Sequence, residues 1–139
     1  MAQTLTYTYL NPSLLHEQDG SLGLALATSG GSTPEGAAAH PYFFSGFMEP
    51  PDVIAASLLV VARVARTRYY TPPGMVAAIL RAADPVVTST SEGLRFESFS
   101  ACCGVYARLD VDSSALDATH SAVGVTNVDV NPPLRTALA

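Results

Sequence analysis

The segment LRFESFSACCGVYARLDV, residues 94–111, has the most regular alternation of apolar and polar residues in this chain. In an extended strand the side chains alternate between two faces, so Leu94 and Phe96 share one face while charged residues occupy the other. From Val105 to Val111 the apolar residues fall on odd numbers instead. The phase has shifted by one residue, which requires a tight turn or a bulge between the two runs. We predict a hairpin, or a sharply kinked pair of adjacent strands, with Ser100–Gly104 at the bend.

Two segments near the N-terminus also have strand character. In residues 5–9 leucine and tyrosine alternate with threonine, and in residues 22–26 leucine alternates with glycine and alanine. β-Branched and aromatic side chains fit a pleated strand well. Asn11-Pro12-Ser13 ends the first segment and Asp19-Gly20 predicts a turn, so we expect the two segments to pair as a hairpin. Another strand is predicted within residues 121–130, which are rich in valine and small residues.

The clearest helix signal follows Pro50-Pro51-Asp52. Proline fits the first turn of a helix, and aspartate is favourable there. At helical spacing the next residues form one wide, largely apolar stripe, made of Val53, Ile54, Ser57, Leu58, Val61, Val64 and Ala65. Leu59, Arg63 and Arg66 fall on the opposite side. We predict a helix over Val53–Arg68 that covers a sheet.

Shorter helical segments are predicted further along the chain. Residues 71–74, Thr-Pro-Pro-Gly, end the long helix, and Met75–Ala83 is expected to form a second short helix. One helical turn at Ser114–Leu116 is expected inside a polar connector, residues 112–120. Asn131, followed by two prolines, predicts the N-cap and first turn of a C-terminal helix.

These segments predict an α+β fold, in which a mainly antiparallel sheet is packed against one long helix and one or two short helices. With 139 residues, 48% of them hydrophobic, the chain can bury one core, so residues 1–139 are expected to form a single domain. The last helical segment is marginally short, so we expect the N-terminal domain of a longer protein. The order of helix and strands is also similar to the repeating unit of DNA sliding clamps, although no clamp-specific residue is identifiable.

The charge composition argues against several classes of partner. The chain has a net charge of −5 and no lysine, whereas binding to nucleic acid or to an anionic membrane needs a basic surface. Nucleic acid is therefore not favoured, although Arg63, Arg66 and Arg68 are the cations that such binding would use. No apolar run is long enough to cross a membrane, and the N-terminus lacks a secretory signal pattern. The cytoplasm is the expected location.

Residues 28–51 are rich in glycine and proline and end in an aromatic cluster. A loop of this length without regular structure is uncommon in a compact domain and often functional; we predict a flexible connector here. The aromatic side chains are candidates for a binding surface, and folding back onto the core is the alternative. They are Tyr42, Phe43, Phe44 and Phe47.

Cys102 and Cys103 are the only cysteines. Thiolates act as nucleophiles, redox groups and metal ligands, so the pair is a candidate redox site. Neighbours in an extended strand point to opposite faces, which disfavours joint chelation of one ion without a turn. Buried structural cysteines are the simpler interpretation, because free cysteine is among the most buried residue types.

No metal or cofactor site is predicted from the other polar residues. His16, His40 and His120 are scattered, without metal-ligand spacing, and are expected to be surface or hydrogen-bonded residues. Asn127, Asp129 and Asn131 alternate and could present oxygens to a cation, but a calcium loop needs more ligands. We expect Asn131 to cap the following helix and the other two side chains to be solvated.

Several segments together resemble the N-terminal region of bacterial SWIM zinc-finger proteins. The resemblance covers about residues 22–138, and its most specific parts are LRFESFS, CCGVYARLD and TNVDVNPPLR. The zinc motif of that family, Cys-x-Cys followed by Cys-x-His, is absent from this chain, so no zinc site carries over. The family is often encoded beside MoxR-type AAA ATPases and von Willebrand A-domain proteins, which implies assembly or chaperone work.

The sequence leaves three function classes open. The absence of a catalytic motif, the aromatic segment and the family setting favour a non-enzymatic interaction or scaffold domain, with an AAA ATPase or a von Willebrand A-domain protein as partner. A redox or enzymatic domain would use Cys102 or Cys103. A clamp-like domain would bind nucleic acid.

Overall fold

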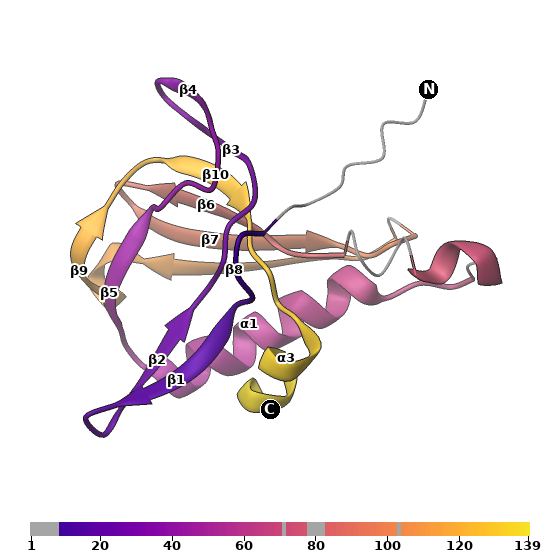
Figure 1. Ribbon diagram of the computed structural model, residues 1–139, viewed down its shortest axis with the longest axis horizontal. Coiled ribbons are helices and arrows are strands. Elements are labelled where there is room, and N and C mark those ends of the chain that lie inside the picture. The colour runs from indigo at the N-terminus through magenta and orange to yellow at the C-terminus, as the bar shows by residue number, and fades with distance from the viewer. Residues whose placement is uncertain (1–8, 71, 78–82, 103) are drawn as a thin grey trace.

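The computed structural model describes residues 9–70, 72–77, 83–102 and 104–139. Its main element is a six-stranded antiparallel sheet in the order β4-β3-β10-β6-β7-β8 (Figure 1). The strands of this sheet are β3 (Gly31–Thr33), β4 (Gly36–Ala38), β6 (Val86–Thr90), β7 (Gly93–Phe99), β8 (Tyr106–Asp112) and β10 (Gly124–Asn127). Two further sheets have two strands each: β1 (Leu14–Gln18) with β2 (Ser21–Ala25), and β5 (Phe44–Met48) with β9 (Leu116–Ser121). The predicted α+β fold is confirmed.

The β7–β8 hairpin is the one predicted from residues 94–111. Leu94 pairs with Val111 and Phe96 with Leu109, so even-numbered residues of β7 face odd-numbered residues of β8 across an uninterrupted register. The one-residue phase shift is therefore produced by the bend and not by a bulge. The Ser100 hydroxyl organises this bend, because it accepts hydrogen bonds from the N–H groups of both Gly104 and Val105 at 3.0 Å.

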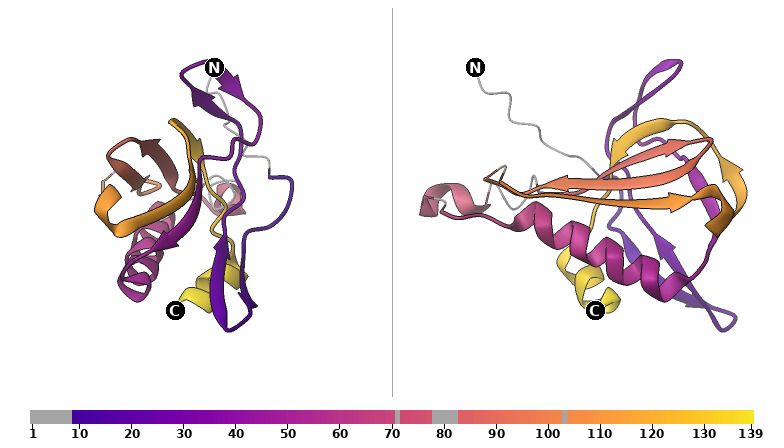
Figure 2. Two further views of the ribbon diagram at one scale, coloured as in Figure 1. Left: turned by 90° about the vertical axis from the view of Figure 1, so that its left-hand side faces the viewer. Right: turned by 180° about the vertical axis from the view of Figure 1, so that it is seen from behind.

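Helix α1 (Pro51–Arg66) packs against β7 and β8, as predicted, although it ends at Arg66 and not at Arg68. The chain leaves helical geometry at Thr67, whose N–H donates to the Val64 carbonyl. The prediction that Leu59 lies on the exposed side is wrong, because this side chain is only 6% exposed. The C-terminal helix α3 (Pro132–Leu138) also packs against α1, so the long helix is covered on more than its sheet side. Figure 2 shows both helices on the same side of the sheet.

The core lies between this sheet and the helices. It is formed by Leu58, Val61 and Ala62 of α1, by Val87, Leu94, Phe96 and Val111 of the sheet, and by Val128, Val130 and Leu134 near the C-terminus. Val128 and Val130 lie between β10 and α3, and Leu134 lies in α3, so the C-terminal part of the chain closes the core.

The prediction of a flexible connector over residues 28–51 is wrong, because this segment contains β3, β4 and β5. Glycine permits the close approach of β3 to β10. A Cβ added to Gly31 would lie 2.4 Å from the Val125 carbonyl oxygen, which is closer than any side chain can pack. The composition typical of a loop thus serves tight strand pairing here.

The first hairpin differs from the prediction. Strand β2 pairs with β1, across a turn in which Asp19 and Gly20 have φ values of 53° and 76°. The predicted turn is confirmed, but the partner strand is Leu14–Gln18 and not residues 5–9, of which 5–8 lie outside the described residues. The sequence LLHEQ lacks a clear alternation, so its pattern does not predict a strand.

The remaining predictions are confirmed in part. The predicted helical turn is a 3-10 turn, η2 (Ser113–Ala115), but the polar connector around it also contains β9. The predicted strand in residues 121–130 is β10. Asn131 caps α3, since its Oδ1 accepts a hydrogen bond of 2.9 Å from the Leu134 N–H. Of the predicted second helix, Met75–Ala83, residues 78–82 lie outside the described part, and the 3-10 turn η1 (Pro73–Met75) overlaps it only at Met75.

Candidate functional site

The predicted aromatic cluster separates into buried and exposed residues. Phe43 is 6% exposed and Phe44 is half-buried, where it packs against the core. Tyr42 and Phe47 are 63% and 68% exposed. Folding back onto the core therefore holds for Phe43 and Phe44, whereas Tyr42 and Phe47 are exposed and stay candidates for a binding surface.

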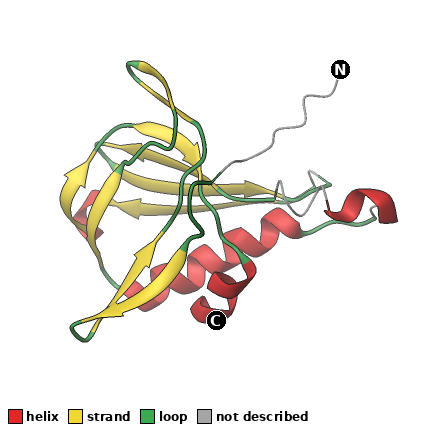
Figure 3. Cartoon of the chain, viewed as in Figure 1, coloured by secondary structure: helices red, strands yellow, loops and turns green. Residues whose placement is uncertain are grey.

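Phe47 lies in β5, and Tyr42 lies two residues before this strand begins. The β5–β9 pair lies at the end of the main sheet where β8 finishes (Figure 3). The Tyr42 ring stacks on the His120 ring, with 4.7 Å between centroids and 7° between planes. His120 Nε2 also lies 3.0 Å from the Tyr42 carbonyl oxygen. We name the exposed side chains of Tyr42, Phe47 and His120 the ribbon surface.

The ribbon surface has a rigid support. The Thr119 hydroxyl donates a hydrogen bond of 3.0 Å to the Ser45 carbonyl, across the strand pair. A register shift between Ser45 and Gly46 bends β5, as bulges do. The residues of β9 from Asp117 to Ser121 are all exposed, whereas Phe44, Met48 and Leu116 of the same strand pair pack against the core.

A small pocket lies between this strand pair and the β6–β7 turn. Its volume is about 90 Å³, and Phe44, Leu116 and several serines line it. The hydroxyl of Ser89, a residue that is 1% exposed, has no hydrogen-bond partner within the described residues. Buried polar groups are normally paired, often by water, and a pocket of this size is large enough to admit water.

Arg135 of α3 lies close enough to Arg63 and Arg66 of α1 for the three positive charges to interact. Burial, and then repulsion from Arg66 and Arg63, lowers the pKa of Arg135 to about 10. Arg66 Nε and Arg135 Nη2 are buried atoms without a hydrogen-bond partner among the described residues. No local sequence pattern indicates Arg135 as a neighbour of these arginines, because it lies far from α1 along the chain.

Two carboxylates adjoin Arg135 but are engaged elsewhere. Burial raises the pKa of Asp84, whose Oδ2 accepts a hydrogen bond of 3.0 Å from the Tyr9 hydroxyl. Asp129 Oδ2 accepts hydrogen bonds of 2.9 Å from the Ser13 N–H and from the Asn131 side chain. The expectation that Asp129 is solvated is therefore wrong.

Asn127 departs from the same expectation, because its amide lies 3.4 Å from the carbonyl oxygens of residues 84 and 85. The contacts of Asn127, Asp129 and Asn131 are those of structural side chains that tie chain segments together. Within the described ranges, no group of three or more histidine, cysteine, aspartate or glutamate residues is placed to hold a metal ion. His40 Nδ1 lies 2.8 Å from the Thr28 carbonyl oxygen, as expected of a hydrogen-bonded histidine.

Cys102 is a free, exposed cysteine in the β7–β8 bend. The expectation of a buried structural cysteine is therefore wrong for this residue, because the bend lies at the end of the hairpin. Its Sγ lies 3.3 Å from the Ser100 hydroxyl, and hydrogen bonds from Ser100 and then from the Gly104 N–H lower the pKa of the thiol. Cys103 lies outside the described residues.

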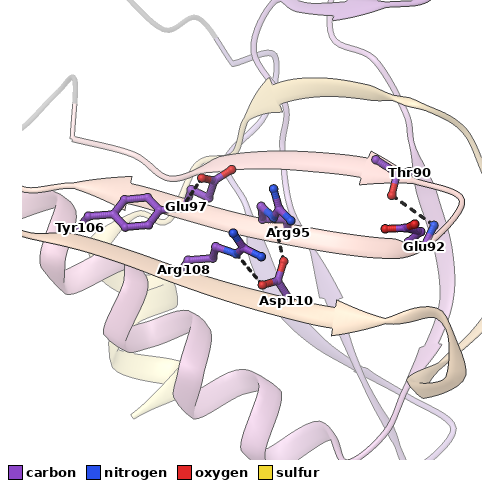
Figure 4. A network of polar contacts seen from close by, with 7 residues as sticks. All are labelled: Thr90, Glu92, Arg95, Glu97, Tyr106, Arg108 and Asp110. Carbon is purple, nitrogen blue, oxygen red and sulfur yellow. Dashed lines mark hydrogen bonds and ion pairs between the residues drawn. The ribbon is translucent and has the colours of Figure 1, made fainter.

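The solvent face of β7 and β8 carries a row of charged side chains (Figure 4). Arg95 Nε lies 2.8 Å from one oxygen of Asp110, and Arg108 contacts the other. These two arginines, Arg95 first, lower the pKa of Asp110. The Tyr106 hydroxyl donates to Glu97 on the same face. We name Arg95, Glu97, Arg108 and Asp110 the charged row.

Comparison with known proteins adds no family assignment. No protein-family model matches the chain, and no curated protein and no solved structure shows significant similarity to it. The resemblance to SWIM zinc-finger proteins and the analogy with sliding clamps therefore remain hypotheses. None of the described helices is long and apolar enough to cross a membrane.

Proposed function

We propose that this chain is a non-enzymatic protein-interaction domain that binds its partner through the ribbon surface. The observation that carries this proposal is the exposure of Phe47 on β5 and of Tyr42 just before it, beside a strand pair that the Thr119–Ser45 hydrogen bond ties together. Aromatic side chains are enriched at protein interfaces and dominate their binding energy. A partner that covers these two rings buries their apolar surface, and few side chains lose conformational freedom when it binds.

The rigidity of the ribbon surface supports the proposal. The Tyr42 ring is already fixed by its stack on His120, so binding orders few additional side chains, and pre-organised groups lose less entropy on association. From the family resemblance, the partner class is an AAA ATPase or a von Willebrand A-domain protein. Its role would be assembly or chaperone work in the cytoplasm.

The test is affinity capture from a nuclease-treated extract of the native host, with bound proteins identified by mass spectrometry. Recovery of an AAA ATPase or a von Willebrand A-domain protein is expected for the unchanged chain. The variants Tyr42→Ala and Phe47→Ala should each lose at least about tenfold in binding, as for an interface hot spot. Failure to recover either class, or retention by both variants, would contradict the proposal.

Phe99→Ala is the matched control for these variants, because Phe99 is 63% exposed on β7, outside the ribbon surface. This variant should bind like the unchanged chain. Phe43→Ala is unsuitable as a probe of binding, since Phe43 is buried and its truncation would weaken the fold itself.

A second candidate function is a thiol-based redox sensor that uses Cys102. The exposed position of this thiol and its lowered pKa favour reactivity. In a Cys103→Ser variant, which leaves Cys102 as the only thiol, the native protein should react with iodoacetamide faster at neutral pH than the urea-unfolded protein does. Equal or slower reaction of the native protein would remove this candidate.

A further inference from the structure

Strand β8 forms a free edge of the six-stranded sheet. All of its residues, Tyr106–Asp112, pair with β7 on one side, and β8 is the terminal strand of that sheet. Helix α1 packs against both β7 and β8, so it covers their face. In the described part of the chain, no backbone hydrogen bond reaches the outer edge of β8.

The bonds at the two ends of the hairpin show which residues direct their backbone outward. Ser100 N–H donates to the Val105 carbonyl, and Ser113 N–H donates to the Glu92 carbonyl. Hydrogen-bonded pairs alternate with non-hydrogen-bonded pairs in an antiparallel ladder. The odd-numbered residues of β8 therefore bond to β7. Tyr106, Arg108 and Asp110 direct their N–H and C=O groups toward the free edge.

This edge lacks most of the usual protection against strand pairing. Natural edge strands carry charged side chains, especially lysine, or proline or bulges, or they are very short. Strand β8 has seven residues, YARLDVD, with no proline and no lysine, and its register with β7 has no irregularity. Its charged side chains, one arginine and two aspartates, differ in sign, so they do not repel a second copy in every register. By contrast, β4 at the other end of the sheet has three residues.

We propose that β8 pairs with β8 of a second copy of this chain, antiparallel and with the two-fold axis at Leu109. In that register Arg108 lies opposite Asp110 of the second copy, and the outward backbone groups of these two residues bond to each other. Leu109 lies opposite its own copy. The two sheets become one continuous sheet, and the two-fold axis, perpendicular to it, places both α1 helices on the same face.

Charge complementarity selects this register. Within one chain Arg95 pairs with Asp110, and Glu97 pairs with Arg108. Across the proposed interface the charged row continues as Arg95, Asp110, then Arg108 and Glu97 of the second copy, so that the charges alternate over four strands. Opposite charges across strands are favourable, and like charges directly opposite are unfavourable. Shifting the axis to residue 108 or 110 places Arg108 opposite Arg108, or Asp110 opposite Asp110.

The register predicts reciprocal charge variants. Arg108→Asp makes both interface positions acidic, and Asp110→Arg makes both basic. Each variant homodimer would contain two like-charged pairs in place of two attractive ones, which should weaken dimerisation by about tenfold or more. An equimolar mixture of the two variants restores an attractive pair at both positions, so a heterodimer should form.

Sedimentation equilibrium measures the dimer dissociation constant of each variant, and native mass spectrometry identifies the heterodimer by its mass. Glu35→Arg is the control for Asp110→Arg, because it makes the same change of charge at an exposed position outside β8 and should dimerise like the unchanged chain. Circular dichroism melting confirms that each variant is folded. Preferential heterodimer formation is a result that loss of folding cannot produce.

Arg108→Pro tests the backbone part of the same interface. Proline is tolerated at an edge position whose N–H faces outward, so the monomer should fold while dimerisation is lost.

The proposal is overturned if the unchanged chain is monomeric at every soluble concentration, which would leave the edge to a strand of another protein. It is also overturned if the charge variants dimerise as tightly as the unchanged chain, or if their mixture forms no heterodimer. These outcomes are independent of the ribbon surface and its partner.

Discussion

The Phe43 ring lies directly against Gly124, so that a Cβ added to this glycine would be 2.2 Å from Cζ of the ring. Gly124 is the first residue of β10, near the middle of the main sheet. Phe43 precedes β5, and its carbonyl accepts a hydrogen bond of 2.8 Å from the Ala122 N–H. This contact joins the base of the β5–β9 pair to the main sheet and thereby supports the ribbon surface.

Gly124→Ala should therefore destabilise the protein. The new methyl group would collide with the Phe43 ring and would lie 2.7 Å from the Ser32 carbonyl oxygen, which belongs to the backbone and yields little. Overpacking of this kind costs about 1–3 kcal/mol, measured as the free energy of unfolding in urea. Gly74→Ala is the control, because nothing lies within 4 Å of the added Cβ, and it should change the stability by less than about 0.5 kcal/mol. Equal effects of the two substitutions would contradict the prediction.

The parts of the fold predicted from sequence are those whose signals are local. The β7–β8 hairpin follows from alternation on both sides of one bend, and α1 follows from a periodic stripe after a proline start. Strands β3, β4 and β5 have no comparable signal, because β3 and β4 are three-residue strands of small side chains and β5, FSGFM, has glycine at its centre. The pairing of β3 and β5 also depends on segments far along the chain. Composition alone cannot separate such strands from a loop.

The candidate sites show the same limit. Sequence singled out the aromatic cluster, but only the packing of Phe43 against Gly124 decides which of its members are buried. Arg66 was predicted without Arg135, which reaches α1 only because α3 folds back against it. Cys102 was expected to be buried because that is usual for the residue type, whereas its position in the bend leaves it exposed.

The N-cap of α3 provides a second test of stability. Asn131 accepts from the Leu134 N–H at 2.9 Å, and its side-chain amide donates to the Ser13 carbonyl at 2.8 Å. Asn131→Ala removes these two bonds and the one to Asp129, and should lower the free energy of unfolding by about 1–2 kcal/mol. Asn131→Asp keeps the capping acceptor but loses the amide donors and brings a second carboxylate close to Asp129. It should therefore also destabilise the protein, and a stability equal to that of the unchanged chain would contradict the role of the amide.

Arg66→Met should stabilise the protein. Arg66 is half-buried, its Nε has no partner among the described residues, and its charge opposes that of Arg135. Methionine keeps the apolar contacts of the stem and removes both unfavourable interactions, so the free energy of unfolding should rise by about 1 kcal/mol. Arg63→Met, at an exposed position, should change it by less than about 0.5 kcal/mol. Urea unfolding of the unchanged chain, Arg66→Met and Arg63→Met at neutral pH measures these differences in stability. A loss of stability in Arg66→Met would contradict the prediction and show that Arg66 makes a favourable contact.

Asp84 should make the stability depend on pH in the direction opposite to that of most carboxylates. Burial, the largest cause, raises the pKa of Asp84 above the ordinary 3.8, despite the hydrogen bonds from Tyr9 and the Val130 N–H. Between 3.8 and the raised value the folded state binds more protons than the unfolded state, so this group favours folding more as the pH falls through that window and less as the pH rises.

Asp84→Asn cannot ionise and should remove this contribution. The difference in unfolding free energy between Asp84→Asn and the unchanged chain, measured in urea across the acidic range, should therefore shift in favour of the variant as the pH rises. Exposed carboxylates such as Asp110, whose pKa is lowered by Arg95 and Arg108, contribute equally to both proteins and cancel in this difference. A difference that does not vary with pH would mean that Asp84 titrates alike in the folded and unfolded chains.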